Sequence, residues 1–310
     1  MSVRYSSVRS VVKQWPRVIA ESLRSRTEMC AGGACCILPD DRVWHGSPLG
    51  ACWLGHATCL LRVGGLTILT DPHFESRAGV RVGPYTVGRR RINELPTSID
   101  ALPPVDVILL SHAHFDHWDR PTLTRLAKRF GVSSERPATV IVPARTRRLV
   151  PRGFQSVIEL PWGEAIDGSG AGLKVSAIRP RHWGARWFID RRRGYNSYLI
   201  EAGGRRVLFG GDTAHTDAFD HIGPGNGGGG VDLAVLGIGT YRHWEHAHAT
   251  PEQAADMAAR MGARLLMPIH HSTFKLDDEP VDEPMERLLK VWDAGRVVCA
   301  RAGEVWAEGG

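Results

Sequence analysis

The hydrophobic pattern from residue 53 onward consists of short apolar runs that are paired around Gly-Gly dipeptides. Two such pairs lie far apart in the chain: residues 60–71, around Gly64-Gly65, and residues 198–212, around Gly203-Gly204. Apolar runs that flank a two-residue glycine turn predict β-hairpins. Both hairpins end in an aspartate, Asp71 and Asp212. We therefore expect two similar half-sheets rather than a solenoid of short repeats.

Helices are predicted between these strands. One is expected over residues 121–130, where apolar residues recur at helical spacing. A second begins at Thr250, because Thr250 and Gln253 form a capping-box pattern around a proline at the first helical position. A strand over residues 265–270 then places His270 at its exit. Strands that alternate with helices indicate an α/β fold.

Residues 1–45 differ in composition from the rest of the chain, because they are rich in Ser and Arg and contain few acids. Apolar residues fall on one helical stripe and basic residues lie elsewhere: Val8, Val11, Val12, Trp15, Val18, Ile19 and Leu23, against Arg9, Lys13, Arg17 and Arg24. Pro16 is expected to bend or divide such a helix. The segment is an arm that packs on the domain, a basic amphipathic segment for a membrane surface, or a cleaved targeting sequence. Residues 46–310 are expected to form a single domain.

Composition narrows the class of protein. The chain has 310 residues, of which 43% are hydrophobic and 23% charged, as in globular domains. Its formal charge of +6 permits an anionic partner. No apolar run reaches the length that spans a bilayer. The six cysteines include no CxxC pair and lack the spacing of a disulfide framework, so reduced thiols in a cytoplasm are expected.

The segment LLSHAHFDHWD, residues 109–119, places three histidines and two aspartates directly after a predicted buried strand. Imidazoles and carboxylates are costly to bury without partners. His112 and His114 leave the same side of an extended chain, and Asp116 and His117 follow after a turn. Three more candidate ligands occur at predicted strand ends: His182, Asp212 and His270. Seven nitrogen and oxygen ligands without cysteine suit two divalent metal ions bridged by a carboxylate.

This HxHxDH motif, followed by single His, Asp and His residues, resembles the metallo-β-lactamase superfamily. Within it, the chain is similar to the N-acylphosphatidylethanolamine-hydrolysing phospholipase D branch and, more distantly, to the ascorbate-6-phosphate lactonase branch. The matching segments span roughly residues 50–280: WLGHATCLL (53–61), DPHF (71–74), SHAHFDHWD (111–119), RHW (181–183), GDT (211–213) and IHHSTF (269–274). The resemblance implies a four-layer αββα sandwich of two similar halves, in agreement with the repeated hairpins.

The resemblance also implies a set of ligands and a mechanism. One zinc ion would be held by His112, His114 and His182, the second by Asp116, His117 and His270, and Asp212 would bridge them. A water between the ions would be the nucleophile, because coordination lowers its pKa. Asp116 would also be catalytic, receiving a proton during the attack. Two Zn²⁺ ions are expected, although Mn²⁺ or Fe²⁺ also suits these ligands.

Several histidines depart from the phospholipase pattern. His271 follows His270 where the phospholipase has tryptophan, so either imidazole could be the ligand, and the IHxxTF register favours His270. His56 is expected to be structural and bonded to nearby backbone. Three others are candidates for substrate contact: His73, His215 and His248. For His73 and His215, the alternative is a partly exposed loop histidine without a role in the reaction.

The leading hypothesis is a zinc-dependent hydrolase of a phosphodiester, similar to the phospholipase D that releases N-acylethanolamine and phosphatidic acid. The alternative is a lactonase or another hydrolase of a water-soluble ester, and the alternative from a different class is a non-catalytic metal-binding protein. No nucleic-acid partner is expected, because no aromatic and basic surface is evident. We expect a cytoplasmic protein, either free or peripheral on an anionic membrane, and the sequence leaves homo-oligomerisation open.

Overall fold

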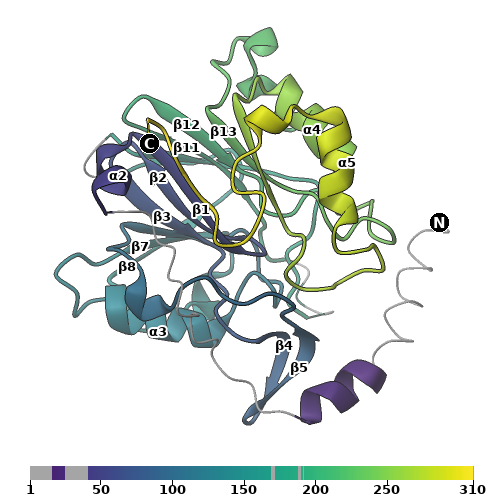
Figure 1. Cartoon of the computed structure of the whole chain (residues 1–310). Coiled ribbons are helices and arrows are strands. Elements are labelled where there is room, and N and C mark those ends of the chain that lie inside the picture. Colours follow the sequence, from purple (N-terminus) through teal and green to yellow (C-terminus); the bar gives the residue numbers. More distant parts are fainter. Residues whose placement is uncertain (1–15, 25–40, 169–171, 188–189, 191, 310) are drawn as a thin grey trace.

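Two β-sheets pack face to face, and helices cover the outer face of each sheet (Figure 1). This arrangement belongs to a computed structural model that describes residues 16–24, 41–168, 172–187, 190 and 192–309. The order of layers is helix, sheet, sheet, helix. The predicted α/β class and αββα sandwich are therefore confirmed.

The first sheet has seven strands in the order β15-β1-β2-β3-β6-β7-β8. Their bounds are β1 Leu49–Gly55, β2 Thr58–Val63, β3 Leu66–Thr70, β6 Val107–Leu109, β7 Thr139–Pro143, β8 Ser156–Leu160 and β15 Val305–Ala307. Strands β2 and β3 form the first predicted hairpin. From β3 to β8 the strands run parallel, so they end at the same edge of the sheet.

The second sheet has six strands in the order β14-β13-β12-β11-β10-β9. Their bounds are β9 Ala165–Asp167, β10 Lys174–Ile178, β11 Ser197–Ala202, β12 Arg205–Phe209, β13 Leu233–Gly237 and β14 Leu265–Ile269. Strands β11 and β12 form the second predicted hairpin. Strands β12, β13 and β14 are parallel, so their carboxyl ends also meet at one edge.

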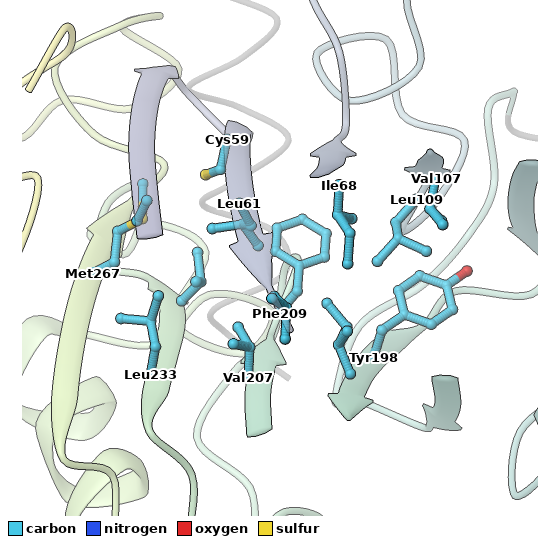
Figure 2. Packing of buried hydrophobic residues seen from close by; sticks show 14 of the residues in the cluster. Cys59, Leu61, Ile68, Val107, Leu109, Tyr198, Val207, Phe209, Leu233 and Met267 are labelled. Atoms are coloured by element: carbon cyan, nitrogen blue, oxygen red, sulfur yellow. The ribbon is translucent and has the colours of Figure 1, made fainter. Parts of the chain in front are cut away.

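The main hydrophobic core lies between the two sheets (Figure 2). There Leu61 and Ile68 of the first sheet pack in one cluster with Tyr198, Phe209 and Leu233 of the second. One further hydrophobic cluster lies between the first sheet and its helices, and another lies between the second sheet and its helices. Strands β1, β2 and β14 are therefore buried along their whole length, which explains why their sequences are nearly continuous apolar runs instead of alternating ones.

The two Gly-Gly turns contact each other. A Cβ atom added to Gly64 would lie 2.3 Å from the carbonyl carbon of Ala202, and one added to Gly203 would lie 2.6 Å from the Cα of Gly64. Both glycines have positive φ, 55° and 54°. Glycine is thus required at these positions by conformation and by space, and the hairpins of the two halves meet at their tips.

The helices begin where capping residues predict. Helix α3, Arg120–Phe130, is capped by Asp119, whose Oδ2 accepts a hydrogen bond from the Thr122 N–H. Helix α4, Pro251–Arg260, has the predicted capping box between Thr250 and Gln253. From residue 41 onward, the described residues also form α2 Asp41–Gly46, α5 Glu283–Val291 and the 3₁₀ turns Ile99–Ala101, Arg147–Leu149, Asp220–Ile222, Pro224–Asn226 and Ala294–Arg296.

A separate hairpin, β4 Arg77–Val82 and β5 Tyr85–Arg90, contacts the described part of the amino-terminal arm. Residues 16–23 are helical, and the Ser22 hydroxyl accepts a hydrogen bond from the Gly88 N–H. Ile19 and Leu23 stay 40% and 54% exposed. The first half of the predicted stripe, Val8, Val11, Val12 and Trp15, lies outside the described residues, so the role of the arm and its boundary at residue 45 stay predictions. No helix in the described residues is long and apolar enough to cross a membrane.

Candidate metal centre

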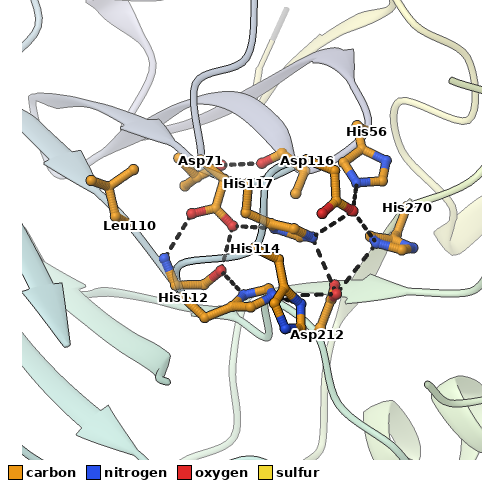
Figure 3. Close-up of polar contacts among 12 residues, drawn as sticks. His56, Asp71, Leu110, His112, His114, Asp116, His117, Asp212 and His270 are labelled. Carbon is orange, nitrogen blue, oxygen red and sulfur yellow. Dashed lines mark hydrogen bonds and ion pairs between the residues drawn. The ribbon is translucent and has the colours of Figure 1, made fainter. Parts of the chain in front are cut away.

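The predicted ligands gather where strands of both sheets end (Figure 3). The HxHxDH segment follows β6 in the first sheet, whereas the other ligands follow strands of the second sheet. His182 comes after β10, Asp212 after β12 and His270 directly after β14. The parallel strands of each sheet bring these ends to a common edge. The site therefore lies between the two halves of the sandwich.

The first group of ligands is formed by His112, His114, His182 and Asp212. His114 Nδ1 lies 2.8 Å from His112 Nε2 and 3.4 Å from His182 Nε2. Asp212 Oδ2 lies 3.6 Å and 3.7 Å from the same two Nε2 atoms. Three imidazole nitrogens and one carboxylate oxygen at these distances could hold one metal ion as its four ligands.

The second group is formed by Asp116, His117 and His270 together with Asp212. Asp116 Oδ2 lies 3.5 Å from Nε2 of both His117 and His270. Asp212 Oδ2 lies 3.1 Å from His117 Nε2 and 3.3 Å from His270 Nε2. Asp212 Oδ2 thus faces both groups, in the position of a bridging ligand.

Buried atoms at the centre are short of hydrogen-bond partners. In the described part of the chain, Nε2 of His117, Nε2 of His270 and Oδ1 of Asp212 form no hydrogen bond. Buried polar atoms without partners are rare in folded proteins and are expensive. Divalent cations would satisfy imidazole nitrogens and carboxylate oxygens of this kind, so the residues present fit a pair of metal ions.

The two groups differ in charge. Burial penalises the Asp212 carboxylate, but the surrounding histidines, chiefly His117, hold its pKa well below its usual range. Burial also disfavours charge on His270, yet Asp212 and Asp116 raise the pKa of this histidine to about 9. In the first group, burial lowers the pKa of all three imidazoles: His112, His114 (to about 4) and His182. Without metal, the first group offers neutral nitrogens, whereas the second holds protons that a metal ion must displace.

Residues behind the ligands orient them. Asp71 Oδ2 lies 2.7 Å from His117 Nδ1, and its Oδ1 accepts a hydrogen bond from the Ser111 N–H at 2.7 Å. The Ser111 hydroxyl lies 2.9 Å from His112 Nδ1, and the Ala247 carbonyl oxygen lies 3.0 Å from His182 Nδ1. Partners of this kind leave the opposite ring nitrogen free for a metal. Asp71 and Ser111 were not among the predicted site residues, although the aspartate at the end of the first hairpin was a usable signal.

His56 is a correction to the sequence analysis. Its backbone has a structural role, because His56 O accepts hydrogen bonds from His270 N and from Trp53 Nε1. Its imidazole, however, is not bonded to nearby backbone but lies with Nε2 2.9 Å from Asp116 Oδ2. The left-handed conformation of His56, with φ of 54°, turns the side chain toward the ligands, and this cannot be deduced from the GHAT motif.

The structure separates the adjacent histidines. His270 joins the second group, whereas the His271 ring packs at a tilt against Trp53, with ring centroids 4.5 Å apart, and places Nδ1 2.9 Å from Ser272 Oγ. A left-handed φ of 63° at His270 gives the two side chains different directions.

The three candidates for substrate contact occupy different places. His248 lies at the centre, with Nδ1 3.8 Å from Asp212 Oδ2. His73 is fully buried against Phe274, so it is closed to a substrate. His215 is not brought to the cluster either, because its Nε2 lies 2.7 Å from Asp256 Oδ2 beside Arg260.

Aromatic side chains lie over the first group. The Trp183 ring stacks on His182 with centroids 4.4 Å apart and meets His114 edge-on at 4.8 Å, yet it is 37% exposed. Trp244 lies beside it, with centroids 6.0 Å apart. Trp183 therefore lies between the ligands and solvent, where a substrate would contact it.

Comparison with known proteins agrees with this geometry. Residues 67–271 match the beta-lactamase superfamily domain. An uncharacterised protein of Mycobacterium tuberculosis is 32% identical over 92% of this chain and 75% of its own length. N-acyl-phosphatidylethanolamine-hydrolyzing phospholipase D 1 of Caenorhabditis elegans is 29% identical over 84% of this chain and 76% of its own length. The structure of Igni18, a metallo hydrolase of Ignicoccus hospitalis, superposes with a TM-score of 0.61 at 20% identity, over 83% of this chain and 97% of that one.

The chain belongs to the beta-lactamase superfamily. It is a metal-dependent hydrolase of that superfamily, and the predicted family and enzyme class are confirmed.

Proposed function

We propose that the protein is a zinc-dependent hydrolase of phosphodiesters, similar in its reaction to N-acylphosphatidylethanolamine-hydrolysing phospholipase D. The observation that carries the proposal is the position of Asp212 Oδ2, which lies within 3.7 Å of ligand nitrogens of both groups. One carboxylate shared between two sets of ligands fits a two-ion centre, which suits the in-line displacement at phosphorus. A set of histidines and aspartates without thiolate fits Zn²⁺, with Mn²⁺ and Fe²⁺ as the alternatives that metal analysis distinguishes.

Two ions held by these residues would polarise a phosphoryl oxygen and lower the pKa of a bound water. In this proposal, Asp116 would receive the proton of that water. Its Oδ2 is held by His56 Nε2 at 2.9 Å, and its side chain is 15% exposed, compared with 2% for Asp212. His248 is a neutral imidazole, since burial lowers its pKa to about 3, so it can hydrogen-bond a substrate oxygen without competing for the proton.

The surroundings of the site support a substrate with an apolar part and a phosphate. Trp183 and Trp187 are 37% and 49% exposed in the loop that carries His182, and Arg181 and Arg192 are exposed in the same loop. Tryptophan binds apolar groups and arginine binds phosphate oxygens. The C. elegans relative is named for hydrolysis of a phospholipid that combines both features. A lactone or another water-soluble ester is the alternative substrate.

Metal analysis joined to a substrate panel tests the proposal. The full-length protein is expressed with supplemented zinc and assayed with a chromogenic phosphodiester, a lactone and an N-acylphosphatidylethanolamine. We expect two zinc ions per chain and turnover of the phosphodiesters. Turnover of the lactone alone would show that the substrate is a lactone and not a phosphodiester. One bound zinc ion per chain, or none, would contradict the two-ion centre.

The variant Asp116→Asn tests the proton acceptor. It keeps the size of the side chain, so the fold is expected to persist, but an amide is a weaker ligand and a poor base. Turnover should fall by roughly 100-fold or more. Circular dichroism and metal content are the controls, and turnover close to wild type would remove Asp116 from the mechanism.

We also propose that the arm binds anionic membranes weakly. In its described part, Ile19 and Leu23 are exposed, and Arg17 and Arg24 are exposed beside them. Each basic residue adds about 1 kcal/mol of attraction near an anionic surface. Wild-type protein should co-sediment with anionic vesicles at low salt, and the double variant Ile19→Ser, Leu23→Ser should do so less. Equal recovery of both proteins in the supernatant would assign the arm to packing on the domain.

A further inference from the structure

A buried carboxylate outside the ligand set lies close to the second group. Glu279 is only 9% exposed and belongs to the loop between β14 and α5. Its Oε1 accepts a hydrogen bond from the Thr240 backbone N–H. Its Oε2 has no hydrogen-bond partner among the residues that the structure describes. An acid buried in this way is expensive, and the ligand set does not use it.

Glu279 bonds to one of two strained residues that face each other. Thr240, which follows β13, and His270, which follows β14, have φ of 67° and 63°. This left-handed region is costly for residues other than glycine, especially for a β-branched one. The chain segments are pressed together, because a Cβ atom on Gly239 would lie 2.3 Å from His270 O. The N–H of each strained residue is held by a partner: His270 N donates to His56 O at 3.0 Å, and Thr240 N donates to Glu279.

The side chain of Thr240 contacts His270, which is one of the candidate metal ligands. Thr240 Oγ1 lies 3.4 Å from His270 Nδ1, whereas His270 Nε2 faces Asp212 and Asp116 at 3.3 Å and 3.5 Å. The partner of the non-ligating nitrogen sets the orientation of a metal-binding histidine. For His117 that partner is a rigidly bonded carboxylate. For His270 it is a hydroxyl whose position depends on the backbone that Glu279 holds.

A small cavity lies between these residues. It measures about 20 Å³, and Thr240, His270, His271 and Glu279 are among the residues that line it. This volume has room for one water molecule. A water there would give Glu279 Oε2 a partner and would leave Oε1 to hold Thr240.

We propose that Glu279 is a positioning residue of the metal centre. It holds Thr240 in the left-handed conformation, so that the Thr240 hydroxyl fixes the His270 ring for the second metal ion. The inference rests on the proposed two-ion function, and its readout is metal affinity rather than turnover.

The test is a titration of the metal-free, full-length protein with Zn²⁺ alone, in competition with a chromophoric chelator. Glu279→Ala should bind the first ion as wild type does and the second about 10- to 100-fold more weakly. Glu279→Gln keeps an acceptor oxygen for the Thr240 N–H, so it should stay within about threefold of wild type. Thr240→Val replaces the hydroxyl with a methyl group of similar size and should resemble Glu279→Ala. The matched control is Asp282→Ala, which removes an exposed acid from the same loop and should behave as wild type.

The outcomes are distinct. If wild type binds two ions and Glu279→Ala binds both equally well, the positioning role is overturned while the proposed function stands. If Glu279→Gln is as weak as Glu279→Ala, the hydrogen bond to Thr240 is not the cause and the inference fails. Should Glu279→Ala not fold, as judged by circular dichroism, Thr240→Val carries the test, and unchanged affinity for the second ion overturns the inference. A wild type that binds fewer than two ions contradicts both proposals.

Discussion

The two hairpins β2–β3 and β11–β12 share one sequence pattern but give their aspartates different tasks. Asp71, at the end of the first hairpin, uses both oxygens in hydrogen bonds or close contacts with Ser111 and His117. Asp212, at the end of the second, turns Oδ2 toward four ligand histidines, and its Oδ1 forms no hydrogen bond in the described residues. His117 lies between the two aspartates. Its Nδ1 is 2.7 Å from Asp71 Oδ2, and its Nε2 is 3.1 Å from Asp212 Oδ2.

The charge around each aspartate explains the difference. Burial raises the pKa of Asp71, and the contacts with His117 and Ser111 offset this only in part. At Asp212, burial acts in the same direction, but several histidines reverse it and hold the pKa well below its usual range. A repeated scaffold thus provides equivalent positions, and the neighbouring side chains decide which one supports a ligand and which one becomes a ligand.

The largest effect is expected when Asp212 is replaced. Asp212→Asn removes the charge that faces both groups, so both ions should bind poorly and turnover should fall by about 10³-fold or more. Metal content and kcat measure this. Asp217→Asn, at an exposed position nearby, is the control. Retention of two ions would show that Asp212 is not the shared ligand.

A large effect is also expected at His270 but not at its neighbour. His270→Ala should lose the second ion and most activity, because its Nε2 faces the second group. His271→Ala should keep both ions and instead lower the free energy of unfolding by about 1–3 kcal/mol, since it removes the packing on Trp53. Zinc content and thermal unfolding distinguish the two, and the reverse result would move the ligand to His271.

A smaller loss is expected at Asp71. Asp71→Asn leaves every ligand in place but weakens the support of His117, so affinity for the second ion or turnover should fall by about 10- to 100-fold. The exposed Asp100 offers a matched control, Asp100→Asn. If Asp71→Asn lowered metal affinity and turnover as much as Asp212→Asn, Asp71 could not be described as a residue that only supports a ligand.

The comparison also predicts a pH dependence. Burial would lower the pKa of His270, but Asp212 and Asp116 raise it to about 9. The same two carboxylates raise the pKa of His117 well above its ordinary value. His270 is therefore protonated in the metal-free protein at neutral pH, and the same carboxylates favour the protonated form of His117, so a metal ion must displace protons. Affinity for the second ion should therefore increase with pH up to about 9. Uptake of zinc in weak buffer should release protons, which a pH indicator detects; uptake without release would contradict these charge states.

A separate prediction concerns stability at the contact between the hairpin tips. Gly64→Ala should destabilise the fold by about 3–5 kcal/mol, because it adds both a strained conformation and an overlap with the Ala202 backbone. Gly65→Ala also has positive φ but meets no atom within 4 Å, so about 1–2 kcal/mol is expected. Denaturant unfolding of the two variants measures the difference. Equal losses would mean that the tips do not press on each other.

Much of the fold could be predicted because its signals are local. The hairpins, the cap at Thr250 and the seven candidate ligands each depend on short patterns. The supporting residues could not be predicted in the same way, since Asp71 meets His117 only through the packing of β3 beside β6. Positive φ at Asp71, His56, Thr240 and His270 also redirects side chains, and no periodicity reveals it. His215 lies away from the cluster because its Nε2 contacts Asp256 Oδ2, a contact that no sequence pattern reveals, and its contact with substrate stays a prediction.

The position of the ligands between the two sheets has a consequence for how the molecule is made. The first sheet supplies residues 112–117, but the last ligand, His270, comes about 150 residues later in the chain. Metal ions would therefore act as a late cross-link that closes the sandwich after both halves have been synthesised. Before this step, a nascent chain has only a partial set of ligands. Binding of a wrong metal ion and cleavage by a protease are therefore expected to be easiest before the sandwich closes.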